Sequence, residues 1–236
     1  MRQQIPNLLT IARAIMAFIF FVLLSQYRYK IPTGDGEFVN GPGWALWWAN
    51  GFFIAAALTD FFDGYLARKW HVESKFGRIM DPFCDKVLII GAFIFLAGPR
   101  FVDPTVILTP NDGFFANIMP GNMVTGVYPW MVAIILAREL LVTGIRGEME
   151  GSGHKFGANM TGKLKMVLQA FTVPWLLGFV YWDPNREGRE WLAIVASIMV
   201  YSTVIMTVLS GLPYISAAAK VAREEKLQKT ADSKEE

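Results

Sequence analysis

Residues 58–86 read LTDFFDGYLARKWHVESKFGRIMDPFCDK and place four aspartates against two apolar segments. Asp60 and Asp63 close the first segment, and Asp81 and Asp85 open the second. Carboxylates are costly inside or beside a membrane segment, and they usually mark a functional site there. Four of them at short, regular spacings therefore predict a reactive site where two helices meet.

The composition indicates a membrane protein. Of the 236 residues, 53% are hydrophobic and 18% are charged, whereas a soluble domain has about 25% charged residues. The net charge of +2 is too small to indicate nucleic-acid binding. We therefore expect an all-α integral membrane protein with six transmembrane helices, since six apolar runs are long enough to span a bilayer: 6–26, 43–66, 83–102, 124–145, 164–182 and 190–212.

The chain is predicted to form one transmembrane domain, residues 1–219, followed by a charged tail, residues 220–236. The tail lacks apolar periodicity and is expected to be a frayed helix or disordered. Two segments rich in Gly, Pro, Asn and Asp, 31–43 and 103–123, are predicted loops.

Basic residues near the ends of the runs predict the side of the membrane that holds the aspartates. Lys and Arg are enriched on the cytoplasmic side. The larger basic set here would share one side with both termini and with the four aspartates, which are then at the cytoplasmic face of the cell's inner membrane. This set is Arg2, Arg68, Lys69, Lys75, Arg78, Arg146, Lys155, Lys163, Lys165, Lys220, Arg223, Lys226 and Lys229. The opposite loops hold Arg28, Lys30, Arg100, Arg186 and Arg189.

The spacing of the aspartates predicts a shared metal site. On a helix, Asp60 and Asp63 are three residues apart and Asp81 and Asp85 four, so each pair lies on one face. If the second and third runs are antiparallel neighbours, the two faces converge. Carboxylate oxygens suit Mg²⁺ or Mn²⁺, and two such ions would form the clamp used in phosphoryl chemistry.

Small and basic residues between the aspartates predict room for a phosphorylated ligand. Gly64, Ala67 and Gly77 leave space on the helix faces for a bulky ligand or for close helix packing. Arg68 can hold a phosphate oxygen in a charge-assisted hydrogen bond.

Each aspartate also has a purely structural interpretation. Asp81 precedes Pro82 and can act as a helix N-cap. Ion pairing would explain single aspartates, but not four of them together with the glycines. The possible ion partners in this stretch are Arg68 for Asp60, and Arg78 or Lys86 for Asp85.

The stretch resembles the signature of the CDP-alcohol phosphatidyltransferase family, D-x-x-D-G-x-x-A-R, eight residues, then G-x-x-x-D-x-x-x-D. Members join a CDP-linked lipid or alcohol to an acceptor hydroxyl and release CMP. The resemblance implies the family's six-helix fold and a homodimer. Every defined position of the signature is matched: Asp60, Asp63, Gly64, Ala67, Arg68, Gly77, Asp81 and Asp85.

The resemblance also implies a role for each matched residue. Asp85 would be the base that takes the proton of the acceptor hydroxyl. Two divalent ions, Mg²⁺ or Mn²⁺, would be held by Asp60, Asp63, Asp81 and Asp85. The CDP-lipid would be bound by Asp63, Gly64, Ala67, Arg68 and Gly77.

A second charged cluster predicts a pocket for another anion, such as a phosphate monoester. Its four cations lie near the same membrane boundary as the aspartates, with Glu139, Thr143 and Gln169 as supporting residues on the same helix faces. The alternative is that Arg138 pairs with Glu139 inside the membrane and that the lysines only follow the cytoplasmic bias. The four cations are Arg138, Arg146, Lys163 and Lys165.

Three further segments resemble the members that use CDP-diacylglycerol and glycerol 3-phosphate to make phosphatidylglycerophosphate. They are PNLLT at 6–10, RELLVTGIR at 138–146 and GKLKMVLQ at 162–169. Cardiolipin-forming members tend to carry Asp where this chain has Glu139. Inositol phosphate, serine and phosphatidylglycerol are the alternative acceptors, and a cation transporter is the alternative of another class. Transport is disfavoured because the acids cluster at one boundary and no repeat is evident.

Cysteine and histidine give no sign of another metal site. The single Cys84 cannot form a disulfide within the chain, and two histidines are too few for a Cys/His cluster. His71 and His154 fall in predicted loops, where a solvated side chain is expected.

Overall fold

The computed structural model describes residues 5–70, 75–106, 121–151, 160–182 and 190–235. Within these ranges it describes the backbone, but not the side chains, of 5–7, 61–70, 75–79, 81, 150, 190, 222 and 224–235. The described chain is mostly helical, as predicted. Its elements are α1 (Ile5–Gln26), β1 (Ile31–Pro32), β2 (Phe38–Val39), α2 (Gly43–Trp70), α3 (Lys75–Leu96), the 3₁₀ turn η1 (Pro99–Phe101), α5 (Pro129–Gly151), α6 (Met160–Tyr181) and α7 (Glu190–Glu235).

Three stretches of the described helices are long and apolar enough to cross a membrane: Leu8–Gln26, Met160–Tyr181 and Trp191–Val221. The other three predicted runs also lie largely on helices, with shifted ends. The run 83–102 leaves its helix after Leu96, and the run 124–145 becomes helical only at Pro129.

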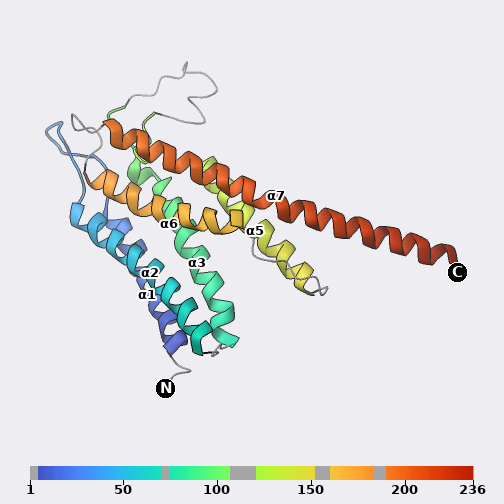
Figure 1. Ribbon diagram of the computed structural model, residues 1–236. Coiled ribbons are helices and arrows are strands. Elements are labelled where there is room, and N and C mark those ends of the chain that lie inside the picture. Colours follow the sequence, from blue (N-terminus) through green and yellow to red (C-terminus); the bar gives the residue numbers. More distant parts are fainter. Residues whose placement is uncertain (1–4, 71–74, 107–120, 152–159, 183–189, 236) are drawn as a thin grey trace, which may run out of the picture.

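The helices form one bundle in which α1 lies against both α2 and α3, while α6 and α5 lie against α7 (Figure 1). Among the described residues, α2 and α3 touch each other far less than either touches α1. The predicted convergence of the two acidic helices is seen in the described residues through α1, against which both helices pack. The helices that carry the aspartates meet at α1.

Aromatic side chains fill the core between these helices. Phe20 of α1 and Phe53 of α2 are fully buried, with ring centroids 5.4 Å apart. Phe21 stacks on Phe95 of α3 at 5.5 Å and lies over Gly91, where a Cβ atom would come within 2.3 Å of its ring. The missing side chain at Gly91 thus lets α1 and α3 pack closely.

The bundle has two different ends. We call the end where α1, α3 and α6 begin and α2 and α5 end the site end, and the opposite end, with β1, β2 and η1, the loop end. The predicted loop 31–43 contains a short antiparallel hairpin, in which Ile31 pairs with Val39. Gly36 makes this possible because its φ of +85° suits a tight turn.

The C-terminal tail is helical. α7 continues to Glu235 as one helix and extends beyond the rest of the bundle in Figure 1. The tail was predicted to be either a frayed helix or disordered, and its backbone is helical up to Glu235.

Candidate active site

Arg13 links the two acidic helices at the site end. Its Nη1 atom lies 2.9 Å from Oδ1 of Asp60 on α2 and 2.9 Å from Oδ1 of Asp85 on α3. The two carboxylates are therefore separated by no more than twice that distance. The Arg13 side chain is only 1% exposed, whereas Asp60 and Asp85 keep 40% and 31% of their side-chain surface. The acids thus converge on a buried cation but remain accessible from outside.

The other two aspartates lie on the same two helices. The backbone of Asp63 is helical, one turn after Asp60, and that of Asp81 is helical, one turn before Asp85. The side chains of Asp63 and Asp81 lie outside the described part of the structure. The same is true of the side chains of Ala67 and Arg68. Among the side chains that are described, no group of three or more metal-binding residues occurs.

The chemistry of the donor set fits divalent cations. Asp60 and Asp85 contribute hard oxygen atoms from two helices, and helical spacing keeps Asp63 and Asp81 on the same faces. These are the residues that could hold the metal ions.

Two structural interpretations of the aspartates are wrong. Asp81 is not a helix N-cap, because α3 begins at Lys75 and Pro82 lies inside it. Among the described side chains, Lys86 forms no ion pair with Asp85, and its Nζ donates to Oγ1 of Thr143 on α5 at 2.5 Å. The side chains of Arg68 and Arg78, the other possible partners, lie outside the described residues. The described ion pair of both Asp60 and Asp85 is with Arg13.

A cavity of about 520 Å³ opens beside Asp85. Its size falls within the usual range for small-molecule sites. It joins the acidic helices to the basic cluster, because every predicted residue of that cluster lines it. The lining includes Asp85, Lys86, Arg138, Glu139, Thr143, Arg146, Lys163, Lys165, Gln169 and Tyr214.

Glu139 organises one wall of this cavity. One of its oxygens, Oε1, accepts a hydrogen bond from Arg138 Nη1 at 3.0 Å and another from Lys165 Nζ. Arg138 also donates to the backbone carbonyl of Ser210 on α7 at 3.3 Å. The intramembrane pair of Arg138 and Glu139, raised above as an alternative, is thus present, and Arg138 is partly committed to it.

The remaining polar residues of the cavity differ in exposure. Lys163 is exposed and Arg146 is half-buried, whereas Gln169 is only 2% exposed. The side-chain nitrogen of Gln169 has no hydrogen-bond partner among the described residues. A buried amide donor beside a cavity is suited to a polar ligand, because leaving it unsatisfied is costly.

Sequence reasoning missed Arg13, Lys86 and Tyr214. Arg13 had a clear signal, because it is the only charged residue in the apolar run 6–26, and a charge at such a position is functional by default. Lys86 and Tyr214 gave less signal. Their place in the cavity depends on how α3 and α7 pack against α5.

Comparison with known proteins gives one family. Residues 3–209 match the model of the CDP-alcohol phosphatidyltransferase family. The chain is also similar to proteins named CDP-diacylglycerol–glycerol-3-phosphate 3-phosphatidyltransferase. The protein from Bacillus subtilis strain 168 is 31% identical over 217 residues, covering 90% of this chain and 94% of that protein. The proteins from Escherichia coli K12 and Cereibacter sphaeroides are 29% identical over 220 residues (92% and 96% covered) and 34% over 195 residues (81% and 72% covered).

Proposed function

The chain belongs to the CDP-alcohol phosphatidyltransferase family, and we propose that it transfers the phosphatidyl group of CDP-diacylglycerol to glycerol 3-phosphate. The products would be phosphatidylglycerophosphate and CMP, in the synthesis of anionic phospholipids. The family predicted from the signature is confirmed. The choice of glycerol 3-phosphate as the acceptor rests on the cation-lined cavity beside Asp85, where a phosphate monoester would lie next to the acids.

The protein would work as a multi-pass enzyme of the inner membrane. Three apolar helices indicate a membrane protein, and we extend this to six spans within residues 1–219 and a cytoplasmic tail at 220–236. The bias of basic residues supports a cytoplasmic site end. The acyl chains would then stay in the bilayer while the head group meets a soluble acceptor. A homodimer is expected from the family resemblance.

Asp60, Asp63, Asp81 and Asp85 would hold two divalent ions, Mg²⁺ or Mn²⁺. When bound, such ions neutralise charge on the diphosphate and on the departing CMP. Arg13 would keep Asp60 and Asp85 at the separation that both ions require, because its buried guanidinium contacts both carboxylates. The CDP-lipid would lie along Asp63, Gly64, Ala67, Arg68 and Gly77.

Asp85 would also act as the general base. The acceptor hydroxyl gives its proton to the Asp85 carboxylate, and its oxygen forms a bond to the phosphorus that carries the diacylglycerol. The bond from this phosphorus to the bridging oxygen breaks, and CMP leaves with the electron pair. An alcohol is a poor nucleophile at neutral pH, and a positioned base typically contributes 10²–10⁴-fold to such a step.

The cations of the cavity would hold the acceptor phosphate. Lys163 and Arg146 line the cavity, and the buried Lys165 is fixed by Glu139. Arg138 would position Glu139 as well as add positive charge. Gln169, whose side-chain nitrogen lacks a partner among the described residues, would donate to an oxygen of the acceptor.

The test is CMP release by the purified protein in detergent micelles with CDP-diacylglycerol, Mg²⁺ or Mn²⁺, and one acceptor at a time. We expect release with glycerol 3-phosphate and not with serine, inositol phosphate or phosphatidylglycerol. CMP release only with another acceptor would overturn the assignment of glycerol 3-phosphate as the acceptor substrate. Metal-dependent cation flux in vesicles without CMP release would instead favour a transporter.

A further inference from the structure

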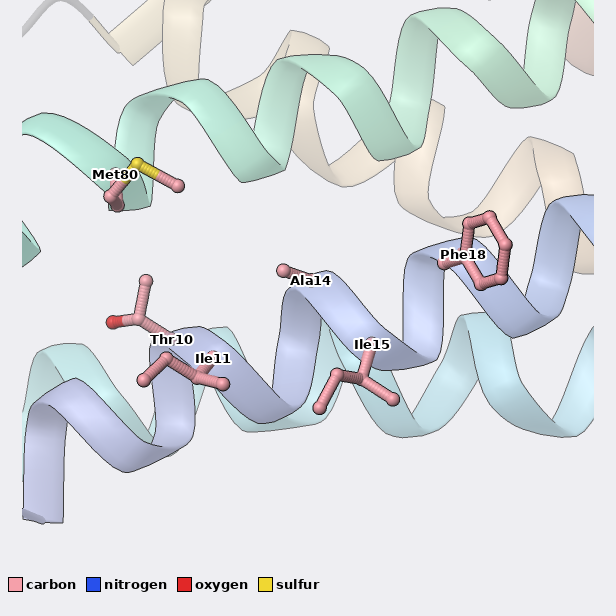
Figure 2. Close-up of a pocket in the computed structure, with 6 residues that line it drawn as sticks. All are labelled: Thr10, Ile11, Ala14, Ile15, Phe18 and Met80. Carbon is pink, nitrogen blue, oxygen red and sulfur yellow. The ribbon is translucent and has the colours of Figure 1, made fainter.

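Two cavities of the bundle differ in what keeps their walls in place. The one between α1 and α3 has a volume of about 290 Å³ and is lined by Thr10, Met80 and apolar side chains of α1 (Figure 2). Packing alone can hold such a wall. The cavity beside Asp85 gathers cations from α3, α5 and α6 instead. Like charges repel one another, so these side chains need to be held in position.

Arg138 is fastened to α7, a helix that lines the cavity with the uncharged Tyr214. The Nη2 atom of Arg138 donates to the backbone carbonyl of Ser210 at 3.3 Å, while its Nη1 atom donates to Glu139 at 3.0 Å. Glu139 also accepts a hydrogen bond from Lys165. A displacement of Arg138 from α7 would therefore be passed through Glu139 to Lys165 at the cavity wall.

Gly211 makes the contact between Arg138 and α7 possible. A Cβ atom at this position would lie 3.3 Å from Cγ of Arg138, which is tighter than an ordinary van der Waals contact. Among the described glycines, Gly211 is the one whose missing side chain faces a charged side chain. Glycine inside a helix costs about 0.5–1 kcal/mol relative to alanine, and room for Arg138 gives a packing reason for it here.

α7 is itself fixed against α6, the helix that carries Lys165. The hydroxyl oxygens of Thr172 on α6 and Thr203 on α7 lie 2.9 Å apart, and both residues are fully buried. Ser210 follows Thr203 by seven residues, about two helical turns, so both lie on the same face of α7. α7 thus contacts both walls of the cavity and sets the place of Arg138 relative to Lys165.

We infer that Gly211 is a positioning residue for the acceptor-phosphate cavity, an inference that rests on the proposed function. It acts through Arg138, whose guanidinium holds Glu139 and, through Glu139, Lys165. A larger side chain at position 211 would push Arg138 away from α7, and a misplacement of about 1 Å can cost about 10²-fold in activity. The change should weaken binding of glycerol 3-phosphate and leave binding of CDP-diacylglycerol and the chemical step nearly unaltered.

The first test is Gly211→Val, with kcat and both KM values measured by CMP release. We expect KM for glycerol 3-phosphate to rise at least about tenfold, while kcat and KM for CDP-diacylglycerol stay within about threefold. Gly211→Ala adds a single carbon, should raise the same KM about threefold, and serves if the valine variant does not fold. Gly51→Val is the matched control and should be silent, because a Cβ atom there would meet no described atom within 4 Å. A lower kcat or lower Tm with unchanged KM would mean that Gly211 only packs the helices, and would overturn the inference.

A double-mutant cycle tests whether Gly211 acts through Arg138. Arg138→Ala removes the Cγ atom that an added side chain would strike. Gly211→Val should therefore change KM for glycerol 3-phosphate by less than about twofold in the Arg138→Ala protein, because two residues that serve one interaction are not additive. Losses that multiply would show that the two residues act independently, and the inference would fail.

Inorganic phosphate separates this inference from the proposed function, because its binding needs no turnover. A ligand that binds only the folded protein raises Tm, and we expect phosphate to raise the Tm of the wild type and of Gly51→Val more than that of Gly211→Val. If the wild type releases no CMP with glycerol 3-phosphate but this difference is seen, the proposed function fails and the positioning role stands. If CMP is released but neither KM nor the phosphate-induced change in Tm responds to Gly211→Val, the proposed function stands and this inference fails.

Discussion

Both ends of the bundle contain an ion pair with aspartate, but the two pairs serve different purposes. At the loop end, Lys30 Nζ lies 2.6 Å from Oδ2 of Asp103, whose other oxygen accepts hydrogen bonds from the hydroxyl and backbone nitrogen of Thr105. The Asp103 side chain is 6% exposed. At the site end, one guanidinium, that of Arg13, is shared by Asp60 and Asp85, which keep 40% and 31% of their surface.

The difference lies in how much of each carboxylate stays exposed. Both oxygens of Asp103 are used within the protein, so this pair fastens the chain after η1 to the residue before β1. At the site end, one guanidinium is shared by two carboxylates that remain partly exposed. A buried and hydrogen-bonded carboxylate stabilises a fold, whereas accessible carboxylates are suited to bind metal ions.

The largest effect is expected from Asp85→Asn, which tests whether the site end, unlike the loop end, is needed for activity. The substitution keeps the size of the side chain but removes the base and a metal ligand, so we expect CMP release to fall about 10³-fold or more. The measurement is CMP release with CDP-diacylglycerol and glycerol 3-phosphate at saturating metal. Asp35→Asn, which changes an exposed acid of the hairpin at the loop end, is the matched control and should be silent. An active Asp85→Asn protein would remove Asp85 from the role of base.

Arg13→Gln comes next in size. Residues that orient metal ligands typically contribute about 10–100-fold to metal affinity or activity, and we expect a loss of this order in CMP release. Arg13→Lys, which keeps the charge but not the planar geometry, should recover part of it. Mn²⁺ binding followed by electron paramagnetic resonance gives a second readout, and affinity should weaken with the glutamine variant. Unchanged Mn²⁺ affinity together with lower thermal stability would mean that Arg13 only holds the helices together.

Glu139→Gln tests the basic wall of the cavity. Loss of the carboxylate charge releases Lys165 and Arg138, and charge-assisted hydrogen bonds are worth about 1.5–3 kcal/mol. We expect KM for glycerol 3-phosphate to rise about tenfold, with kcat changed less. Glu148→Gln, an exposed acid on the same helix, is the control. A fall in kcat with constant KM would place Glu139 in the chemical step instead.

The sequence was sufficient for the parts of the structure that depend on short spacings. The helical spacing of Asp60 with Asp63 and of Asp81 with Asp85 follows directly from the residues, and so does the shared face of Glu139, Thr143 and Arg146 on α5. The basic cluster was found because charged residues interrupt the fourth apolar run and the two lysines open the fifth, and all of it lines the cavity.

Tertiary partners were the part that could not be predicted. Nothing in the spacing says that α1 lies against both α2 and α3, so Arg13 was not paired with the acids. The N-cap interpretation of Asp81 failed because α3 starts eight residues earlier than its apolar run suggests, and hydropathy does not register a charged first turn. The hairpin at β1 and β2 is also too short to produce an alternating pattern.

The smallest effect on activity is expected at the loop end, with Asp103→Asn. Burial alone would raise the pKa of Asp103, but hydrogen bonds from Lys30 and Thr105 lower the pKa below its ordinary value. A lowered pKa in the folded state means that the carboxylate stabilises the protein above its unfolded pKa, and that this contribution is lost as the pH falls through the folded pKa. At pH 7 the variant should therefore melt a few degrees lower, a loss of about 1–2 kcal/mol for a charged hydrogen-bonded pair, with CMP release within about twofold of the wild type.

Thermal unfolding of both proteins between pH 7 and pH 3 measures this contribution. The gap in Tm should be widest near neutral pH. It should shrink as the pH falls below the ordinary pKa of an aspartate, about 3.9, toward the lower pKa of the folded carboxylate. Thr125→Val, which removes a hydroxyl that donates to the neutral backbone carbonyl of Leu96, controls for general weakening because its effect should not depend on pH. A pH-independent gap for Asp103→Asn would show that shape rather than charge fastens the loop end. A large loss of CMP release would mean that the two ends are coupled. The conclusion that the loop end contributes to stability and the site end to activity would then be wrong.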